Sequence, residues 1–197
     1  MAQHVIQFEN FSYIRVLGNH SWTVMKIVSF IFLFAIAISS NGQTKNPFLT
    51  IKFDKVKMYD FENGDGSDTS IVDDKGELAT SISKIVQLRK QTITKLNIKL
   101  GDKKSYGGAT DSCFDPHLGF VYYLNGKIVE HITISLDCNR LRSSIDIPAQ
   151  KQGKVGNDKD AYYISNGLSR SFRQFINVLL KRNQFSHQIK PGSSFDK

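Results

Sequence analysis

The clearest pattern of apolar and polar positions lies in residues 113–138, where two runs rich in aromatic and β-branched residues flank the dipeptide Asn125-Gly126. Asn-Gly is the strongest short signal for a β-hairpin, because a type I′ turn needs positive φ at both central residues. The pattern therefore predicts two antiparallel strands joined by a turn at Asn125 and Gly126.

A two-residue turn also determines which residues of the two strands lie opposite each other. The opposed pairs expected from this register are Tyr122 with Val129, Phe120 with His131, and Cys113 with Cys138. The cysteine pair falls at a non-hydrogen-bonded position, where the Cα atoms of antiparallel strands come closest. The register thus predicts a disulfide bond at the open end of the hairpin.

Residues 167–182 show the clearest helical pattern. The apolar residues that recur at helical spacing are Leu168, Phe172, Phe175, Ile176 and Leu179. Arginines, Arg173 among them, fall on the opposite side, and Ser165 and Asn166 are candidate N-caps. We expect this helix to bury its apolar stripe, Phe175 included, against a sheet and to turn Arg173 toward solvent.

The remaining patterns are weaker. Residues 88–100 fit both a helical face and an alternating strand, and we favour a helix because Gly101 is well placed to end it. Residues 102–108 read as a loop, residues 47–53 and 55–59 as one or two strands, and residues 145–147 as a short strand. Together these elements predict an α+β fold: a mainly antiparallel sheet with a central, disulfide-closed hairpin and two packed helices.

The N-terminal region carries an export signal. Residues 27–38 are almost wholly apolar and follow Met25-Lys26, and this stretch is shorter than the roughly 20 residues that span a bilayer. We expect cleavage before Gln43, so residues 1–42 form an N-terminal extension plus signal peptide and no permanent membrane span. Met25 is the favoured start of translation, and an unusually long but real leader is the alternative. Residues 43–190 then make a single domain, followed by a disordered tail at 191–197.

Composition adds little to this picture. The chain has a net charge of +8, with basic residues mostly interspersed with acids and one local excess around Arg170, Arg173, Lys181 and Arg182. A solvated cationic surface is a better account of that excess than a nucleic-acid site. The acidic loop at 62–70 lacks the glycine that a calcium loop needs at its sixth position, which argues against an EF-hand.

The open end of the hairpin offers one chemical alternative. The predicted register places Cys113, Asp115, His117, Glu130 and Cys138 on one face, and His131 on the other. Two thiolates and an imidazole from Cys113, Cys138 and His117 would suit zinc or copper. In an exported chain, however, two cysteines brought together more simply form a disulfide, and then no cofactor is expected.

Residues 113–138 also resemble a family of uncharacterised exported bacterial proteins. That family carries the motif C-F-x-P-R-H-G, a hairpin, and then I-C-F-x-C. Residues 113–116 and Gly119 match its first half, and residues 134–138 match its second half in outline. His117, Leu118 and Ser135 depart from it, because they stand where the family has arginine, histidine and the first cysteine of its C-x-x-C. The resemblance supports the fold and implies no activity.

Known catalytic patterns are missing from the sequence, which contains no HExxH or GxSxG motif and no Ser-His-Asp order. The leading expectation is therefore an exported, periplasmic or extracellular, monomeric domain that binds an unidentified partner or is structural, and is not an enzyme. The alternative is the thiol or metal site at Cys113, His117 and Cys138.

Overall fold

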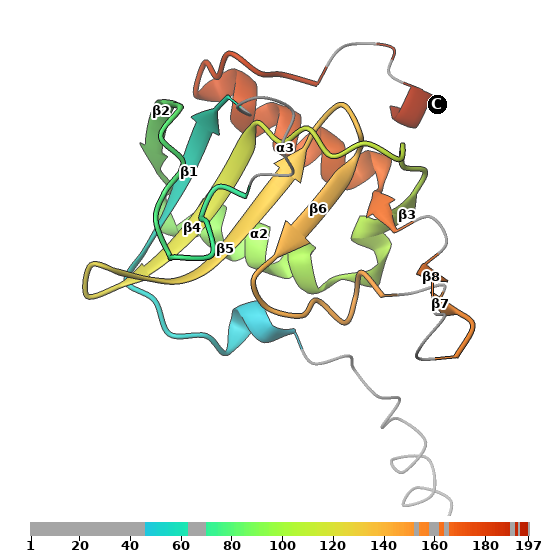
Figure 1. The fold of residues 1–197 in the computed structure, drawn as a ribbon, viewed down its shortest axis with the longest axis horizontal. Helices are drawn as coiled ribbons and strands as arrows, with labels where there is room; N and C mark the ends of the chain where they lie inside the picture. The colour runs from blue at the N-terminus through green and yellow to red at the C-terminus, as the bar shows by residue number, and fades with distance from the viewer. Residues whose placement is uncertain are drawn as a thin grey trace, which may run out of the picture. The chain divides into compact units, whose positions relative to one another are not determined.

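The centre of the fold is a five-stranded antiparallel sheet with the strand order β2-β1-β4-β5-β6 (Figure 1). The structure, a computed structural model, describes residues 46–62, 70–151, 154–157, 162–163, 166–189, 192 and 194–196. The strands of the sheet are β1 (Lys55–Phe61), β2 (Ile82–Gln87), β4 (Leu118–Leu124), β5 (Lys127–Ser135) and β6 (Arg140–Ser143). Strand β4 is almost continuously apolar because it is central and buried on both faces.

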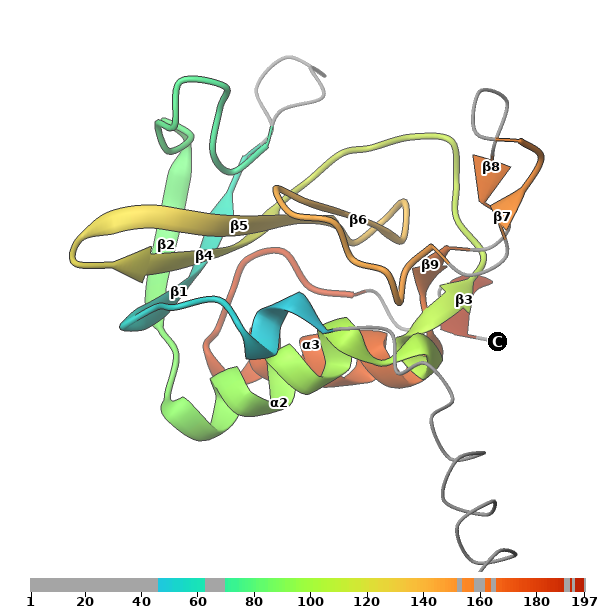
Figure 2. The same ribbon diagram turned by 90° about the horizontal axis from the view of Figure 1, so that it is seen from below.

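Two helices cover one face of this sheet (Figures 1 and 2). They are α2 (Lys90–Gly101) and α3 (Arg170–Arg182), and their apolar stripes join the even-numbered side chains of β4 in the main core. The smaller elements are η1 (Pro47–Leu49), η2 (Lys103–Ser105), β3 (Tyr106–Gly108), β7 (Lys154–Val155), β8 (Tyr162–Tyr163), β9 (Gly167–Leu168) and η3 (Ser194–Asp196). Strand β3 pairs with β9, and β7 pairs with β8.

The opposite face of the sheet is covered by the segment that leads from residue 70 into β2. This segment buries Ile71 and Val72 against Tyr59, Phe61 and Val121 in a second, smaller cluster. Ile71 can approach this closely because Gly119 has no side chain: a Cβ at that position would lie 2.5 Å from the isoleucine. Both faces of the sheet are therefore dry in its middle.

The predicted hairpin is present, but its register changes part-way along. Asn125 and Gly126 have φ angles of 51° and 81°, as the predicted turn requires. Tyr123 faces Ile128 as expected, whereas Tyr122 faces Glu130 instead of Val129. Val129 is an extra residue on β5, a β-bulge that shifts every later pair by one. The sequence pattern could not locate this bulge, since Val129 fits a regular strand equally well.

The bulge corrects two expectations about the hairpin faces. His131 lies opposite Val121 and not opposite Phe120. Glu130, now paired with Tyr122, is buried and accepts a hydrogen bond from Ser143 Oγ, so it does not join His117 in one cluster. Burial raises the pKa of the Glu130 carboxyl despite the hydrogen bonds that it accepts.

The predicted disulfide joins Cys113 and Cys138, with a Cα–Cα distance of 5.6 Å. The two cysteines are nevertheless not strand partners, because β4 begins only at Leu118 and β5 ends at Ser135. Pro116 precedes the ladder, as expected of a residue that cannot donate a backbone hydrogen bond. The bond therefore links the segment before β4 to the turn after β5.

Helix α3 is where the predicted burial is wrong. Phe175 is only partly buried, whereas Arg173 is 2% exposed. The Arg173 guanidinium donates to Leu136 O at 3.1 Å and to Asn139 Oδ1 at 3.0 Å, both in the turn between β5 and β6. Periodicity assigned the arginine to solvent because it cannot show that a neighbouring turn presents acceptors to it. Ser169, not Ser165 or Asn166, is the N-cap.

Several weaker expectations are also corrected. Residues 47–53 contain η1 and no strand, so within the described residues 46–62 the one strand is β1. The predicted strand at 145–147 is absent, and β6 lies just before it. Residues 102–108 contain η2 and β3 and are not a plain loop. The edge strand β2, which the sequence pattern does not predict, completes the sheet.

The α+β fold class, the mainly antiparallel sheet, the two helices and the disulfide are confirmed. No helix within the described residues is long and apolar enough to cross a membrane. The predicted signal peptide at residues 1–42 lies outside those residues. Disorder of the tail at 191–197 stays a prediction; among the described residues of that tail, Ser194–Asp196 forms one turn of 3-10 helix.

We expect Arg173→Ala to lower the free energy of unfolding by about 3 to 5 kcal/mol, since it leaves the buried acceptors Leu136 O and Asn139 Oδ1 without their guanidinium donor. Phe175→Ala should cost roughly 1 to 2 kcal/mol, less than for a fully buried phenylalanine. The exposed Arg170 provides the control, because Arg170→Ala should change stability by less than about 0.5 kcal/mol. Denaturant melts measure all three, and equal losses at positions 170 and 173 would contradict the buried guanidinium.

The disulfide should stabilise the domain by about 3 kcal/mol through the loop that it closes. The double variant Cys113→Ala/Cys138→Ala should therefore unfold at a lower denaturant concentration than the oxidised protein. A reducing agent should lower the midpoint of the wild type and leave that of the variant unchanged. An unchanged wild-type midpoint under reducing conditions would show that the crosslink does not carry this stability.

Candidate metal centre

Three segments far apart in the sequence meet at the end of strand β1. The first is the strand end itself, with Asp60 and Glu62. The second is the segment before β4, which carries His117, and the third is the segment after α3, which carries Ser186 and His187. None of these side chains except His117 was singled out by the sequence, because the three segments lie at least 55 residues apart along the chain.

The C-terminus of α3 explains how His187 reaches this place. Gln184 adopts a positive φ of 53°, its N–H donates to Lys181 O, and the Phe185 N–H donates to Leu180 O. These two hydrogen bonds are those of a Schellman motif, which reverses the chain sharply at a helix end. Phe185 is buried, and this anchors the turn so that the next two residues face β1.

Asp60 is the buried anchor of the site. Its side chain is 1% exposed and accepts hydrogen bonds from Ser186 N at 2.7 Å, Ser186 Oγ at 2.6 Å and His187 Nδ1 at 2.8 Å. Burial alone raises the pKa of Asp60, but the hydrogen bonds from Ser186 and His187 outweigh burial, and the pKa is lowered. The carboxylate is therefore ionised at neutral pH and holds the His187 ring in one orientation.

The two imidazoles lie face to face. The rings of His117 and His187 are 3.9 Å apart between centroids and only 3° from parallel. His117 Nδ1 lies 3.3 Å from Phe61 O, which can only accept, so this nitrogen carries the proton. By the same reasoning His187 donates its Nδ1–H to Asp60. In each neutral ring the Nε2 atom is left with its lone pair.

Carboxylates surround the free sides of the rings. His187 Nε2 lies 3.5 Å from Glu62 Oε1, and His117 Nε2 lies 3.4 Å from Asp115 Oδ2. Glu62 and Asp115 are exposed, whereas the two histidine side chains are mostly buried, at 25% and 13% exposure. Imidazole nitrogens beside carboxylate oxygens are a ligand set that suits zinc and copper.

The spacing tests how well this set fits one ion. Ligand atoms of Glu62, His117 and His187 all lie within 4.8 Å of one another. Two ligands of the same zinc ion lie at most about 4.2 Å apart, because each bond is about 2.1 Å long. The two stacked rings are parallel, so the lone pairs of their nitrogens lie in parallel planes and do not converge on one ion. Binding one ion therefore requires a modest rotation of the rings out of the stack, for which the exposed Glu62 leaves room.

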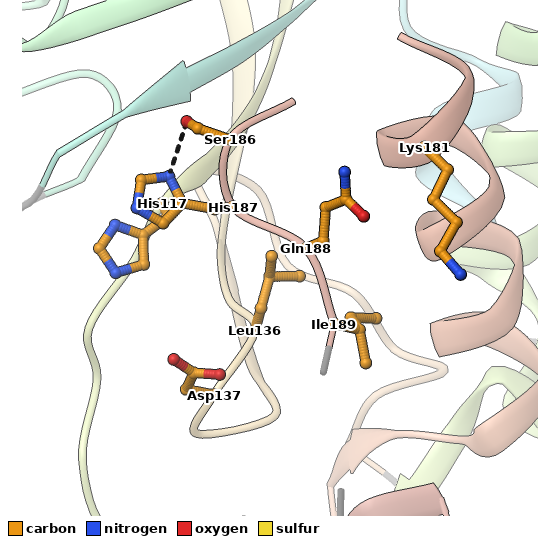
Figure 3. A pocket seen from close by; sticks show the side chains of 8 residues that line it. All are labelled: His117, Leu136, Asp137, Lys181, Ser186, His187, Gln188 and Ile189. Atoms are coloured by element: carbon orange, nitrogen blue, oxygen red, sulfur yellow. Dashed lines mark hydrogen bonds between the residues drawn. The ribbon is translucent and has the colours of Figure 1, made fainter. Parts of the chain in front are cut away.

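A pocket of about 510 Å³ opens beside the histidines (Figure 3). Its lining residues are His117, Leu136, Asp137, Lys181, Ser186, His187, Gln188 and Ile189. The pocket gives solvent and small ligands access to the ring pair from the side of α3. It also places one cation, Lys181, near a cluster that is otherwise rich in carboxylates.

Ser186, His187 and Asp60 do not form a serine-protease type of triad. The only nitrogen of His187 near Ser186 Oγ is Nδ1, at 3.5 Å, and this atom already bonds Asp60. Ser186 Oγ itself donates to the Asp60 carboxylate, so His187 is not placed to take the serine proton as it would in such a triad.

The sequence pattern predicts Cys113, His117 and Cys138 as an alternative set of metal ligands. The structure joins the two cysteines to each other and places His117 against His187 instead. A thiolate site would require the disulfide to be reduced, because only a thiolate is a metal ligand. The tertiary fold thus supplies a different set of partners for the one predicted histidine.

Comparisons of this chain with protein-family models, with curated proteins and with solved structures find no match.

Replacing the buried carboxylate by its amide, Asp60→Asn, should lower the free energy of unfolding by about 1.5 to 3 kcal/mol at neutral pH. A carboxyl whose pKa is lowered by folding stabilises the protein above its unfolded pKa of about 4, and this contribution is lost as pH falls through the folded pKa. The difference from wild type should therefore shrink in acid. The exposed Asp137 is the control, and an equal loss in Asp137→Asn, or a difference independent of pH, would contradict this.

Proposed function

We propose that this chain is an exported, non-enzymatic binding domain whose ligand is a divalent transition-metal ion, zinc or copper, held by His117, His187 and Glu62. The observation that carries the proposal is the hydrogen bond between the buried Asp60 and His187 Nδ1. Metal-bound histidines usually donate their second ring N–H to a carboxylate or carbonyl, which fixes the ring and makes the ligand nitrogen more basic. Both histidines of the pair have such an acceptor, Asp60 and Phe61 O.

Export is the second part of the proposal. It is supported by the apolar segment at residues 27–38 and by the Cys113–Cys138 disulfide, which is typical of an oxidising compartment. With both sulfurs bound to each other, imidazole and carboxylate groups are the metal ligands that remain. Asp115, beside His117 Nε2, is placed to complete the coordination.

Protons and the metal compete for this site. A ligating imidazole must be neutral, so affinity should fall as the pH is lowered. At low pH the positive charges of two imidazolium rings would instead be compensated by the carboxylates of Asp60, Glu62 and Asp115. The site should have a higher affinity for copper than for zinc, following the general order of affinities of divalent metals for nitrogen and oxygen ligands.

Titration of the purified, oxidised protein with zinc or copper, followed by calorimetry and bound-metal analysis, tests the proposal. We expect one ion per chain for the wild type. His117→Ala and His187→Ala should each reduce affinity by more than the roughly 10- to 100-fold typical of losing an outer-shell partner, and Asp60→Asn should fall within that range.

Two matched controls separate this site from other metal ligands. His131 is a described histidine outside the cluster, and His131→Ala should bind metal as the wild type does. The double variant Cys113→Ala/Cys138→Ala should also keep its affinity, because the proposed ligands are not thiolates. Loss of binding in the cysteine variant, with binding retained in His187→Ala, would instead favour the thiol site. Absence of stoichiometric binding in the wild type would overturn both.

A further inference from the structure

The helical layer, defined as α2 and α3, is strongly basic. Neither helix contains an aspartate or a glutamate. Six of their cations are exposed or half-exposed: Lys90, Lys95, Lys99, Arg170, Lys181 and Arg182. Within the described part of the chain none of the six forms an ion pair. This layer therefore presents positive charge that no nearby carboxylate on the helices neutralises.

The two helices present these charges together. They lie on the same face of the sheet (Figures 1 and 2). Lys99 Nζ, near the end of α2, lies 3.4 Å from Ser171 Oγ at the start of α3. At the other end, Thr92 of α2 and Leu179 of α3 line a common pocket. The helices are thus antiparallel neighbours, and their cations belong to one surface.

Apolar side chains interrupt this charge on each helix. Ile98 of α2 is 54% exposed and Val178 of α3 is 53% exposed. Although the main apolar stripes of both helices face the sheet, these two exposed aliphatic side chains add apolar area that a membrane interface would bury. They contribute nothing to the binding of a phosphate backbone, which is read by charge and hydrogen bonds.

Carboxylates gather away from the helical layer. Asp73, Asp74 and Glu77 belong to the segment that covers the opposite face of the sheet. Lys75 lies in the same segment, and Lys55 and Lys57 lie over the Tyr123 ring on that face, so its charges are mixed and the unbalanced positive charge is on the helical layer. The field of an anionic surface therefore attracts the helical layer more strongly than the opposite face. The helical layer would then face that surface.

We propose that the helical layer docks peripherally on an anionic lipid membrane, with its cations at the headgroups and with Ile98 and Val178 inserted among them. Basic residues near an anionic leaflet each contribute modestly, and the apolar side chains add a component that salt does not screen. The helical layer shares Lys181 with the pocket beside the proposed metal centre, but the proposed metal ligands lie outside the two helices, so membrane binding does not require a bound metal.

Sedimentation with vesicles tests this surface, using the disulfide-intact protein in the presence of a chelator. One set of vesicles is phosphatidylcholine alone, and the other contains equal parts of phosphatidylcholine and phosphatidylglycerol. We expect the wild type to bind only the second set, and to bind it less as salt is raised. Lys95→Glu and Arg170→Glu should each lower the partition coefficient at least about fivefold, which corresponds to about 1 kcal/mol per cation.

The matched control is Lys75→Glu/Lys127→Glu, which changes the net charge as Lys95→Glu/Arg170→Glu does but lies outside the helical layer. It should retain most of the binding, whereas the helix pair should lose it. Ile98→Ser/Val178→Ser should weaken the binding that persists at high salt. Equal loss in the two charge pairs, no binding to anionic vesicles, or binding to a duplex DNA probe but not to vesicles would each overturn the proposal.

Discussion

A guanidinium buried between helix α3 and the sheet is the constraint on which much of this fold depends. Arg173 needs acceptors because a charged group cannot be buried without them. The turn between β5 and β6 supplies Leu136 O and Asn139 Oδ1, and the same Asn139 donates to Ala109 O and Leu168 O. One fully buried asparagine thus joins the turn, the helix and the segment entering the helix.

The disulfide lies next to this network. Cys138 directly precedes Asn139, and its bond to Cys113 holds the segment before β4 against the turn after β5. That segment carries His117. The disulfide and Arg173 therefore both hold the turn between β5 and β6, the first from the segment before β4 and the second from α3. Together they determine where His117, the first histidine of the candidate site, lies.

Asp60 is a second buried charge that needs hydrogen-bonding partners, but it is negative where Arg173 is positive. A buried carboxylate needs donors, and Ser186 and His187 provide them from the segment after α3. The outcome is a stacked histidine pair whose outward nitrogens face carboxylates. A cluster assembled in this way is specific in position, because each ring is oriented by its own acceptor, but it keeps exposed groups that can rearrange around a ligand.

The disulfide was predicted correctly, although the strand register used to pair its cysteines is wrong, because the bulge shifts the ladder and neither cysteine lies in a strand. The sequence alone determined the features that depend on local periodicity and turn chemistry: the hairpin at Asn125-Gly126 and the helices. Those signals act over a few residues, so they survive without knowledge of the fold. Tertiary structure decided the bulge at Val129, the burial of Arg173, and the meeting of Asp60, His117 and His187. Each of these depends on a partner distant in the chain, whose hydrogen-bonding groups no local pattern reveals.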